Sequence, residues 1–220
     1  DLVVGFGLAR LRISVAQSRG IVREARRRYR RHNAGRRYVE REFFAALAAS
    51  HHSQPDPDNV RYRLRRDSRV LEALERMWPV LTPAQLLRDL FGSKALIASA
   101  AGEHFSEEES LTLFRPRGES LSDYRWSDAD VALLDEAYSG LGPRLDRQRK
   151  ARDPEIRTFG HIVVDETQDH TPMALRMISR RSLNGSMTLV GDIAQATAPG
   201  AAANWDEVLN YMPTGASEHR

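Results

Sequence analysis

A pair of acids, Asp165 and Glu166, directly follows an apolar run, His-Ile-Val-Val, in the last third of the chain. Acids at the carboxyl end of a buried strand lie where α/β folds bind ligands. One carboxylate of such a pair can hold Mg²⁺, while its neighbour polarises a water for attack on a phosphate. The pair therefore indicates phosphate chemistry; the alternative is an ordinary strand end that meets solvent.

A second apolar run, residues 187–190, leads into Gly191 and Asp192, and Gln195 follows three residues later. Gly191 allows a close approach of the backbone, and the amide of Gln195 could sense a terminal phosphate. The pattern Asp-Glu-x-Gln-Asp at 165–169 precedes this motif by the length of one strand–helix–strand unit. The two motifs are therefore expected to meet at one edge of a parallel sheet.

The elements that position these motifs begin near residue 158. Residues 161–165 and 187–190 read as strands, and Thr171-Pro172 begins a helix between them. Because both apolar runs are continuous rather than alternating, we expect a parallel sheet that is buried on both faces. Asn204 is expected to cap a last helix.

The preceding stretch is expected to be mostly helical. Residues 2–13 predict a short strand or hairpin, and a capping box at Ser14 predicts a helix that continues to about residues 33–35. A second helix is expected over residues 38–50, followed by a loop over 51–59, since Pro55 and Pro57 disfavour regular structure there. Cap residues and apolar spacing predict further helical segments over residues 60–77, from Thr82 to Gly92, between Ser93 and Gly102, from Ser106 onward and from Ser127 to Gly140.

The segments 161–173 and 181–195 resemble motifs II and III of the UvrD/Rep-like superfamily 1 helicases, and are most similar to the bacterial HelD group. HelD proteins have a UvrD-like motor but work on RNA polymerase. The specific motifs cover about residues 158–210, and weaker likeness extends to the segments around Trp78, Trp126 and Trp205. The resemblance implies an α/β fold: part of a RecA-like P-loop NTPase with a parallel sheet and a large, mostly α-helical insertion.

In residue terms, the resemblance implies a nucleotide site. Asp165 would hold Mg²⁺, Glu166 would be the general base for hydrolysis of ATP or GTP, and Gln195 would contact the γ-phosphate. Gln168 and Asp169 would couple the nucleotide site to movement. Gly191 and Asp192 would shape the sensor loop.

The resemblance also implies an order of domains. Residues 1–13 would be a hairpin returning to the motor core, 14–157 the helical insertion, and 158–220 the distal part of the first RecA-like domain. The chain begins with Asp1 rather than Met, and we expect it to be an internal segment of a longer motor.

Two departures limit the comparison with UvrD. No Gly-x-x-x-x-Gly-Lys loop is present, because Lys94 follows Ser93 and Lys150 follows Arg149; the main cradle for the β- and γ-phosphates is therefore missing. After Gln195 the chain reads Ala-Thr-Ala-Pro-Gly, without the base-stacking aromatic residue and the Arg of UvrD-like proteins. This argues against ordinary strand unwinding, and HelD-like proteins share the loss. We expect the chain alone to hydrolyse nucleotide poorly or not at all.

Charge is unevenly distributed although the formal net charge is only +3. Twelve arginines lie within residues 1–41, against Asp1, Glu24 and Glu40. Arg binds phosphate and carboxylate in a fixed fork, which favours nucleic acid or an acidic protein surface as a partner. The candidate contacts with RNA polymerase or DNA are Arg23, Arg26, Arg27, Arg30 and Arg31. The alternative is an Arg-rich composition on a solvated helix face.

Composition excludes several classes of protein. Without cysteine there is no disulfide framework, cysteine zinc finger or cysteine nucleophile. The sequence has no long apolar run and no basic-then-apolar leader, so we expect a cytoplasmic protein. Two non-enzymatic alternatives stay open: a module that binds polymerase or nucleic acid under nucleotide control, and a basic nucleic-acid-binding domain unrelated to motors.

Overall fold

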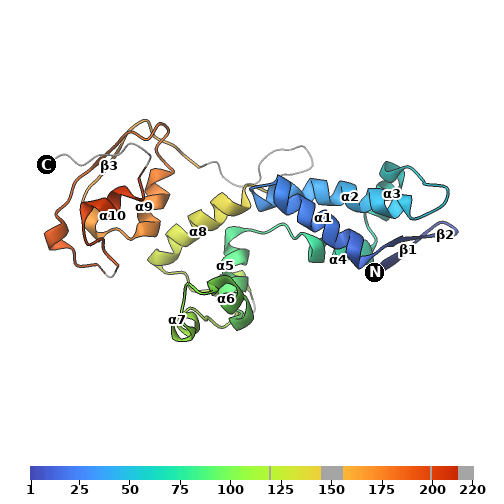
Figure 1. Cartoon of the computed structure of the whole chain (residues 1–220), viewed down its shortest axis with the longest axis horizontal. Coiled ribbons are helices and arrows are strands. Elements are labelled where there is room, and N and C mark those ends of the chain that lie inside the picture. Colours follow the sequence, from blue (N-terminus) through green and yellow to red (C-terminus); the bar gives the residue numbers. More distant parts are fainter. Residues whose placement is uncertain (119, 145–155, 199, 213–220) are drawn as a thin grey trace. The chain divides into compact units, whose positions relative to one another are not determined.

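The computed structural model describes residues 1–118, 120–144, 156–198 and 200–212; the expected domain ranges 14–157 and 158–220 extend in part beyond them. In this part of the chain the fold is mixed α/β and mostly helical, with ten α-helices and two two-stranded sheets (Figure 1). One sheet is antiparallel and the other parallel. The mixed α/β class is thus confirmed, whereas the RecA-like assignment stays a prediction.

The chain divides into two compact units. Unit 1 comprises Asp1–Leu86 and Tyr138–Asp153, and unit 2 comprises Leu87–Ala137 and Pro154–Arg220. Unit 1 begins with a hairpin of β1 (Leu2–Phe6) and β2 (Ala9–Ile13), in the region where the sequence predicts one. Its helices are α1 (Val15–Arg28), α2 (Arg36–Ala49), α3 (Pro57–Leu64) and α4 (Ser68–Met77).

The core of unit 1 lies between the hairpin and these helices. Val4, Leu11 and Ile13 on one face of the hairpin are almost completely buried. They belong to the same apolar cluster as Phe43 and Leu47, which are one helical turn apart on α2. The hairpin therefore contributes a packed face to unit 1, whereas the parallel strands lie in unit 2.

Helix α1 is shorter than the sequence predicts. The capping box is confirmed, since Ser14 and Gln17 satisfy each other's backbone amides, but the helix ends at Arg28 and a separate 3-10 turn covers His32–Gly35. The cause is tertiary. The Asn33 amide donates to the carbonyls of Leu81 (3.0 Å) and Gly142 (2.8 Å) and accepts from the backbone N–H of Leu81. These bonds fix residue 33 outside the α1 helix.

The expected loop at 51–59 is also too long, because α3 begins within it at Pro57. Proline is well suited to the first helical turn, where its missing N–H has no intrahelical partner to lose. Asp56 caps this turn by accepting from the backbone N–H of Asn59 at 3.2 Å. Pro57 therefore starts a helix rather than preventing one.

Unit 2 contains the remaining elements, several of which begin at the predicted cap residues. Ser93, Ser106, Thr171 and Asn204 each accept a hydrogen bond from a backbone N–H in the first turn of the following helix. The elements are α5 (Pro83–Phe91, which begins in unit 1), α6 (Lys94–Ala101), α7 (Glu107–Thr112), α8 (Asp128–Leu141, which ends in unit 1), β3 (Ile162–Val164), α9 (Pro172–Ser179), β4 (Met187–Leu189) and α10 (Trp205–Leu209). Within the described ranges, none of the helices is both long and apolar enough to cross a membrane.

Among the residues that the structure describes, the parallel sheet is covered on one face only, which contradicts the prediction of burial on both faces. Val164 and its register partner Leu189 lie on the covered side, where Leu189 packs against a cluster that includes Leu175 of α9 and Val208 of α10. Val163, which points to the opposite face, is 66% exposed. A continuous apolar run does not distinguish a strand covered on both faces from one whose second face has no neighbour among the described residues.

Candidate functional site

The ends of β3 and β4 meet at one edge of the sheet, as the spacing of the two motifs predicts. The strands pair in parallel with Val164 opposite Leu189. The ladder then continues beyond both strands, because Val190 N–H donates to the Val164 carbonyl (2.9 Å) and Thr167 N–H donates to the Val190 carbonyl (3.0 Å). The segments that carry the two motifs are therefore held together by backbone hydrogen bonds.

Gln168 joins the two motifs through its side chain. It is only 1% exposed, and its Oε1 accepts from the backbone N–H of Asp192 at 3.1 Å. Its Nε2 donates to Oε2 of Glu166 at 2.6 Å. Both ends of this buried amide are thus satisfied, which is the condition under which a buried polar group stabilises its surroundings. The resemblance assigns Gln168 to coupling, and the structure places it between Glu166 and Asp192.

Gly191 makes this contact possible. A Cβ at position 191 would lie 2.2 Å from Oε1 of Gln168 and 3.0 Å from the backbone N of Thr167. The first distance is far shorter than any van der Waals contact, so a side chain here would displace the amide of Gln168. At position 191 the lack of a side chain therefore permits the close approach of Gln168.

Glu166 has an unusual backbone conformation. Its φ is 49° and its ψ is 44°, which is left-handed and uncommon for a residue other than glycine. Such a conformation costs on the order of 1–3 kcal/mol and is concentrated at functional sites. The carboxylate of Glu166 is exposed, and its hydrogen bond with Gln168 uses Oε2 rather than Oε1. Glu166 is thus oriented by Gln168 and open to solvent.

Asp165 and Asp192 are also exposed carboxylates at this edge. Oδ1 of Asp165 accepts from the backbone N–H of Glu166 at 2.9 Å. Asp192 accepts from the backbone N–H of Ala194 (3.0 Å) and from Nε2 of Gln195 (2.9 Å). The amide of Gln195 is therefore held beside Asp192.

Asp169 connects the first motif with the segment that follows the second. Its Oδ1 accepts from the backbone N–H groups of Thr197 (3.2 Å) and Ala198 (3.4 Å). Hydrogen bonds thus join Glu166, Gln168, Asp192 and Gln195, and Asp169 bonds the segment that follows Gln195. Asp165 accepts from the backbone of Glu166, and Gly191 lies against Gln168.

The described residues contain no group of three or more His, Asp or Glu side chains arranged to hold a metal ion. Mg²⁺ does not require such a cage, because it is commonly bound by one or two carboxylates together with substrate phosphates and water. The exposed carboxylate of Asp165 is an oxygen donor of the kind that Mg²⁺ prefers.

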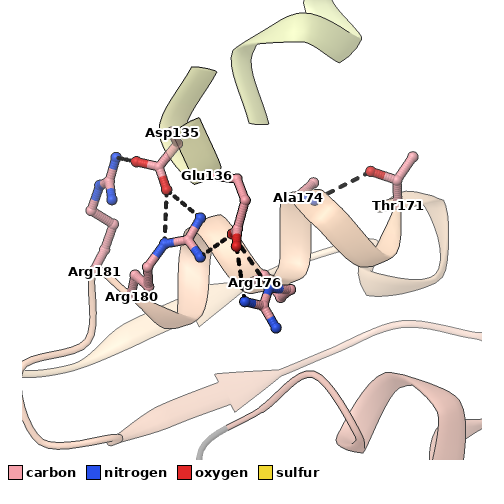
Figure 2. Close-up of polar contacts among 7 residues, drawn as sticks. All are labelled: Asp135, Glu136, Thr171, Ala174, Arg176, Arg180 and Arg181. Atoms are coloured by element: carbon pink, nitrogen blue, oxygen red, sulfur yellow. Dashed lines mark hydrogen bonds and ion pairs between the residues drawn. The ribbon is translucent and has the colours of Figure 1, made fainter. Parts of the chain in front are cut away.

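A cluster of ion pairs ties α9 to α8, and the sequence analysis did not anticipate it (Figure 2). Asp135 accepts from Nε (2.9 Å) and Nη2 (2.6 Å) of Arg180 and also pairs with Arg181, while Glu136 pairs with Arg180 (2.5 Å) and Arg176 (3.1 Å). Asp135 is only 8% exposed. A double acid on one helix and a double arginine after another are the available signals, but pairing them requires the tertiary structure.

The electrostatics of this cluster favour the ionised acid. Burial alone would raise the pKa of Glu136, but the hydrogen bonds from Arg180 and Arg176 outweigh it and hold that pKa below its usual value of 4.5. For Arg180, burial acts to lower the pKa, and the bonds to Asp135 and Glu136 raise it overall. The cluster therefore ties α8 to α9, the helix that follows the first motif in the chain.

The five arginines nominated as partner contacts are all exposed, but they do not lie on one helix. Arg23, Arg26 and Arg27 belong to α1, whereas Arg30 and Arg31 follow its end. Arg27 is paired with Glu24. The bonds from Arg27 and Arg28 lower the pKa of Glu24 to about 2, so this acid neutralises part of the local positive charge under physiological conditions.

Comparison with known proteins adds no assignment: no protein-family model matches the sequence, and no curated protein matches it. The functional interpretation therefore depends on the motifs and their geometry.

Gly191→Ala is expected to destabilise unit 2, because the new Cβ must displace the amide of Gln168. We expect a loss of about 1–3 kcal/mol in the free energy of unfolding, which is typical of overpacking, measured by urea denaturation. Gly160→Ala is the matched control, since a Cβ there has nothing within 4 Å. Equal stability of the two variants would contradict the close approach of residues 168 and 191.

Glu136 is expected to contribute to acid sensitivity. Its pKa is lowered in the folded chain, so its contribution to stability is complete above the ordinary value of 4.5 and is lost as the pH falls through the folded pKa. Glu136→Gln should flatten the dependence of unfolding free energy on pH in this acid range, whereas Glu103→Gln at an exposed position of unit 2 should not. Identical pH profiles for wild type and Glu136→Gln would contradict the ion-pair cluster.

Proposed function

We propose that this chain supplies the metal-binding and water-activating part of an ATP- or GTP-hydrolysing motor of the UvrD-like class, closest to the HelD group. The observation that supports this is the hydrogen-bonded edge at the ends of β3 and β4, where Gln168 joins Glu166 to Asp192. In α/β proteins with parallel strands, ligands bind at this edge of the sheet.

Each residue at the edge has a proposed task. Asp165 would hold Mg²⁺, which when bound would neutralise charge on the nucleotide phosphates. Glu166 would accept a proton from the attacking water, and Gln168 would keep its carboxylate oriented through the 2.6 Å hydrogen bond. The amide of Gln195 would give up its hydrogen bond to Asp192 and donate to the terminal phosphate instead. Asp169 would transmit this change through its bonds to Thr197 and Ala198.

We propose further that β3 and β4 belong to a RecA-like sheet. The uncovered face with Val163 (66% exposed) and the exposed Val190 (51%) are compatible with further packing partners in a larger sheet. Because the sequence has no Gly-x-x-x-x-Gly-Lys loop, the β- and γ-phosphates would need a cradle from another segment. Hydrolysis by these 220 residues alone is therefore expected to be slow or absent.

A second candidate function is contact with RNA polymerase or nucleic acid through unit 1. The observation that favours it is the group of exposed arginines on and after α1, which would attract a polyanionic or acidic surface. This function is compatible with the motor in a longer protein. A basic domain without any motor relationship would differ in one respect: its binding would be indifferent to Asp165 and Glu166.

The nucleotide assignment predicts different effects for the two adjacent acids. In titrations with a fluorescent triphosphate nucleotide, Asp165→Asn should weaken Mg²⁺-dependent binding by about tenfold or more, because it removes a charged ligand of the ion. Glu166→Gln should bind nearly as well as wild type, since a general base acts on water rather than on the ion. Asp206→Asn, at an exposed acid of α10, is the control for lost charge.

Nucleotide binding that is insensitive to both EDTA and Asp165→Asn would refute the magnesium role. Turnover is the second readout, measured as phosphate release. Rapid turnover by the wild-type chain would contradict the requirement for an added phosphate loop. If Glu166→Gln abolished that turnover, the proposed role of Glu166 would still be supported.

A further inference from the structure

Unit 1 contains a large open pocket between α2, α3 and α4, here named the α2–α3 pocket. Its volume is about 1260 Å³, above the roughly 300–1,000 Å³ of typical small-molecule sites. It is lined by six arginines, Arg36, Arg37, Arg41, Arg61, Arg65 and Arg144, against two acids, Glu40 and Asp58. Two acids outside the lining pair with two of these arginines, Glu75 with Arg36 and Glu42 with Arg41. The size of the pocket and its exposed arginines Arg61 and Arg65 favour an extended anionic ligand over a small metabolite.

The arginines of the pocket have different tasks. Arg36 is mostly buried and donates to the carbonyls of Leu74 (3.1 Å) and Trp78 (2.5 Å) at the end of α4, so it is part of the structure. Arg61, by contrast, is 55% exposed and lies 3.5 Å from Glu40, an acid that Arg36 already neutralises at 2.8 Å. Arg65 is exposed at the end of α3. Arg61 and Arg65 are therefore available to an incoming anion.

An exposed aromatic ring lies next to Arg65. Tyr62 is 67% exposed although it carries an apolar ring, and the guanidinium of Arg65 lies over that ring at 4.6 Å from its centroid. Leu71 (45% exposed) and Val80 (38% exposed) add apolar surface to the same pocket. Exposed rings beside guanidinium groups can stack on bases while the arginines bind the backbone phosphates.

We infer that the α2–α3 pocket binds single-stranded nucleic acid, with Arg61 and Arg65 on phosphates and Tyr62 stacked on a base. An acidic peptide would use the arginines alone, whereas a single strand would also use the face of the Tyr62 ring opposite Arg65. Unstacked bases of a single strand present the flat faces that this ring can cover. This ligand class rests on the second candidate function, contact of unit 1 with nucleic acid. It places that contact at the α2–α3 pocket rather than at the arginines of α1.

The test is fluorescence anisotropy of a labelled twelve-nucleotide oligothymidylate with the full 220-residue chain, titrated at several salt concentrations. Tyr62→Ala should weaken binding about tenfold, the size of one lost base–ring stack, without changing the slope of log K against log salt. Arg61→Gln and Arg65→Gln should each weaken binding about fivefold and reduce that slope by about 0.7. Tyr62→Phe should retain binding, because the ring is kept.

Two controls separate this pocket from other basic surfaces. Arg66→Gln, next to Arg65 but not among the residues lining the pocket, should change affinity less than about twofold, and circular dichroism should show that every variant is folded. Loss of binding with Arg23→Gln and Arg26→Gln but not with the pocket variants would overturn the pocket while keeping the second candidate function.

Three other results would also overturn the inference. One is the absence of oligonucleotide binding by the wild-type chain at low salt. Another is equal binding of a duplex combined with indifference to Tyr62→Ala, which would mean that only charge is recognised. The third is displacement by polyglutamate at equal charge concentration with no effect of Tyr62→Ala, which would identify an acidic protein surface as the ligand. None of these results bears on Asp165 and Glu166.

Discussion

The buried amide of Gln168 is the contact on which the edge of the β3–β4 sheet depends. It is bonded at one end to Glu166 and at the other to the backbone of Asp192, and it lies where any side chain at position 191 would have to be. An amide enclosed in this way can satisfy both its donor and its acceptor only if the two strand ends keep their present spacing. The left-handed backbone of Glu166 is tolerated because this network holds it.

Much of the secondary structure could be predicted from local signals. Capping boxes at Ser14 and Ser106 and the cap at Thr171 mark helix starts that the structure contains, because capping is decided within four residues of the chain. Tertiary effects were not visible in the same way. The end of α1 depends on Asn33, whose partners lie 48 and 109 residues away in the sequence. The exposure of Val163 depends on which elements pack against the parallel sheet, and a single strand sequence does not encode this.

The candidate site could likewise be predicted only in part from the sequence. The spacing of Asp-Glu-x-Gln-Asp and Gly-Asp-x-x-Gln was sufficient to predict that the motifs share an edge, since parallel strands place their carboxyl ends together. The task of Gln168 as the link between them, and the clash that makes Gly191 necessary, appeared only in the structure. The same holds for the pairing of Asp135 with Arg180 and for the pocket around Tyr62, which gather residues from separate helices.

The central claim is that the ends of β3 and β4 form one metal–nucleotide site. The most direct measurement is paramagnetic broadening of backbone amide signals in the ¹⁵N-labelled chain by Mn²⁺ added with a nonhydrolysable triphosphate nucleotide. The account predicts selective loss of the signals of residues 165–168 and 191–195. Broadening that avoids these two segments, or that gathers instead at the exposed acids Glu107–Glu109 of α7, would contradict it.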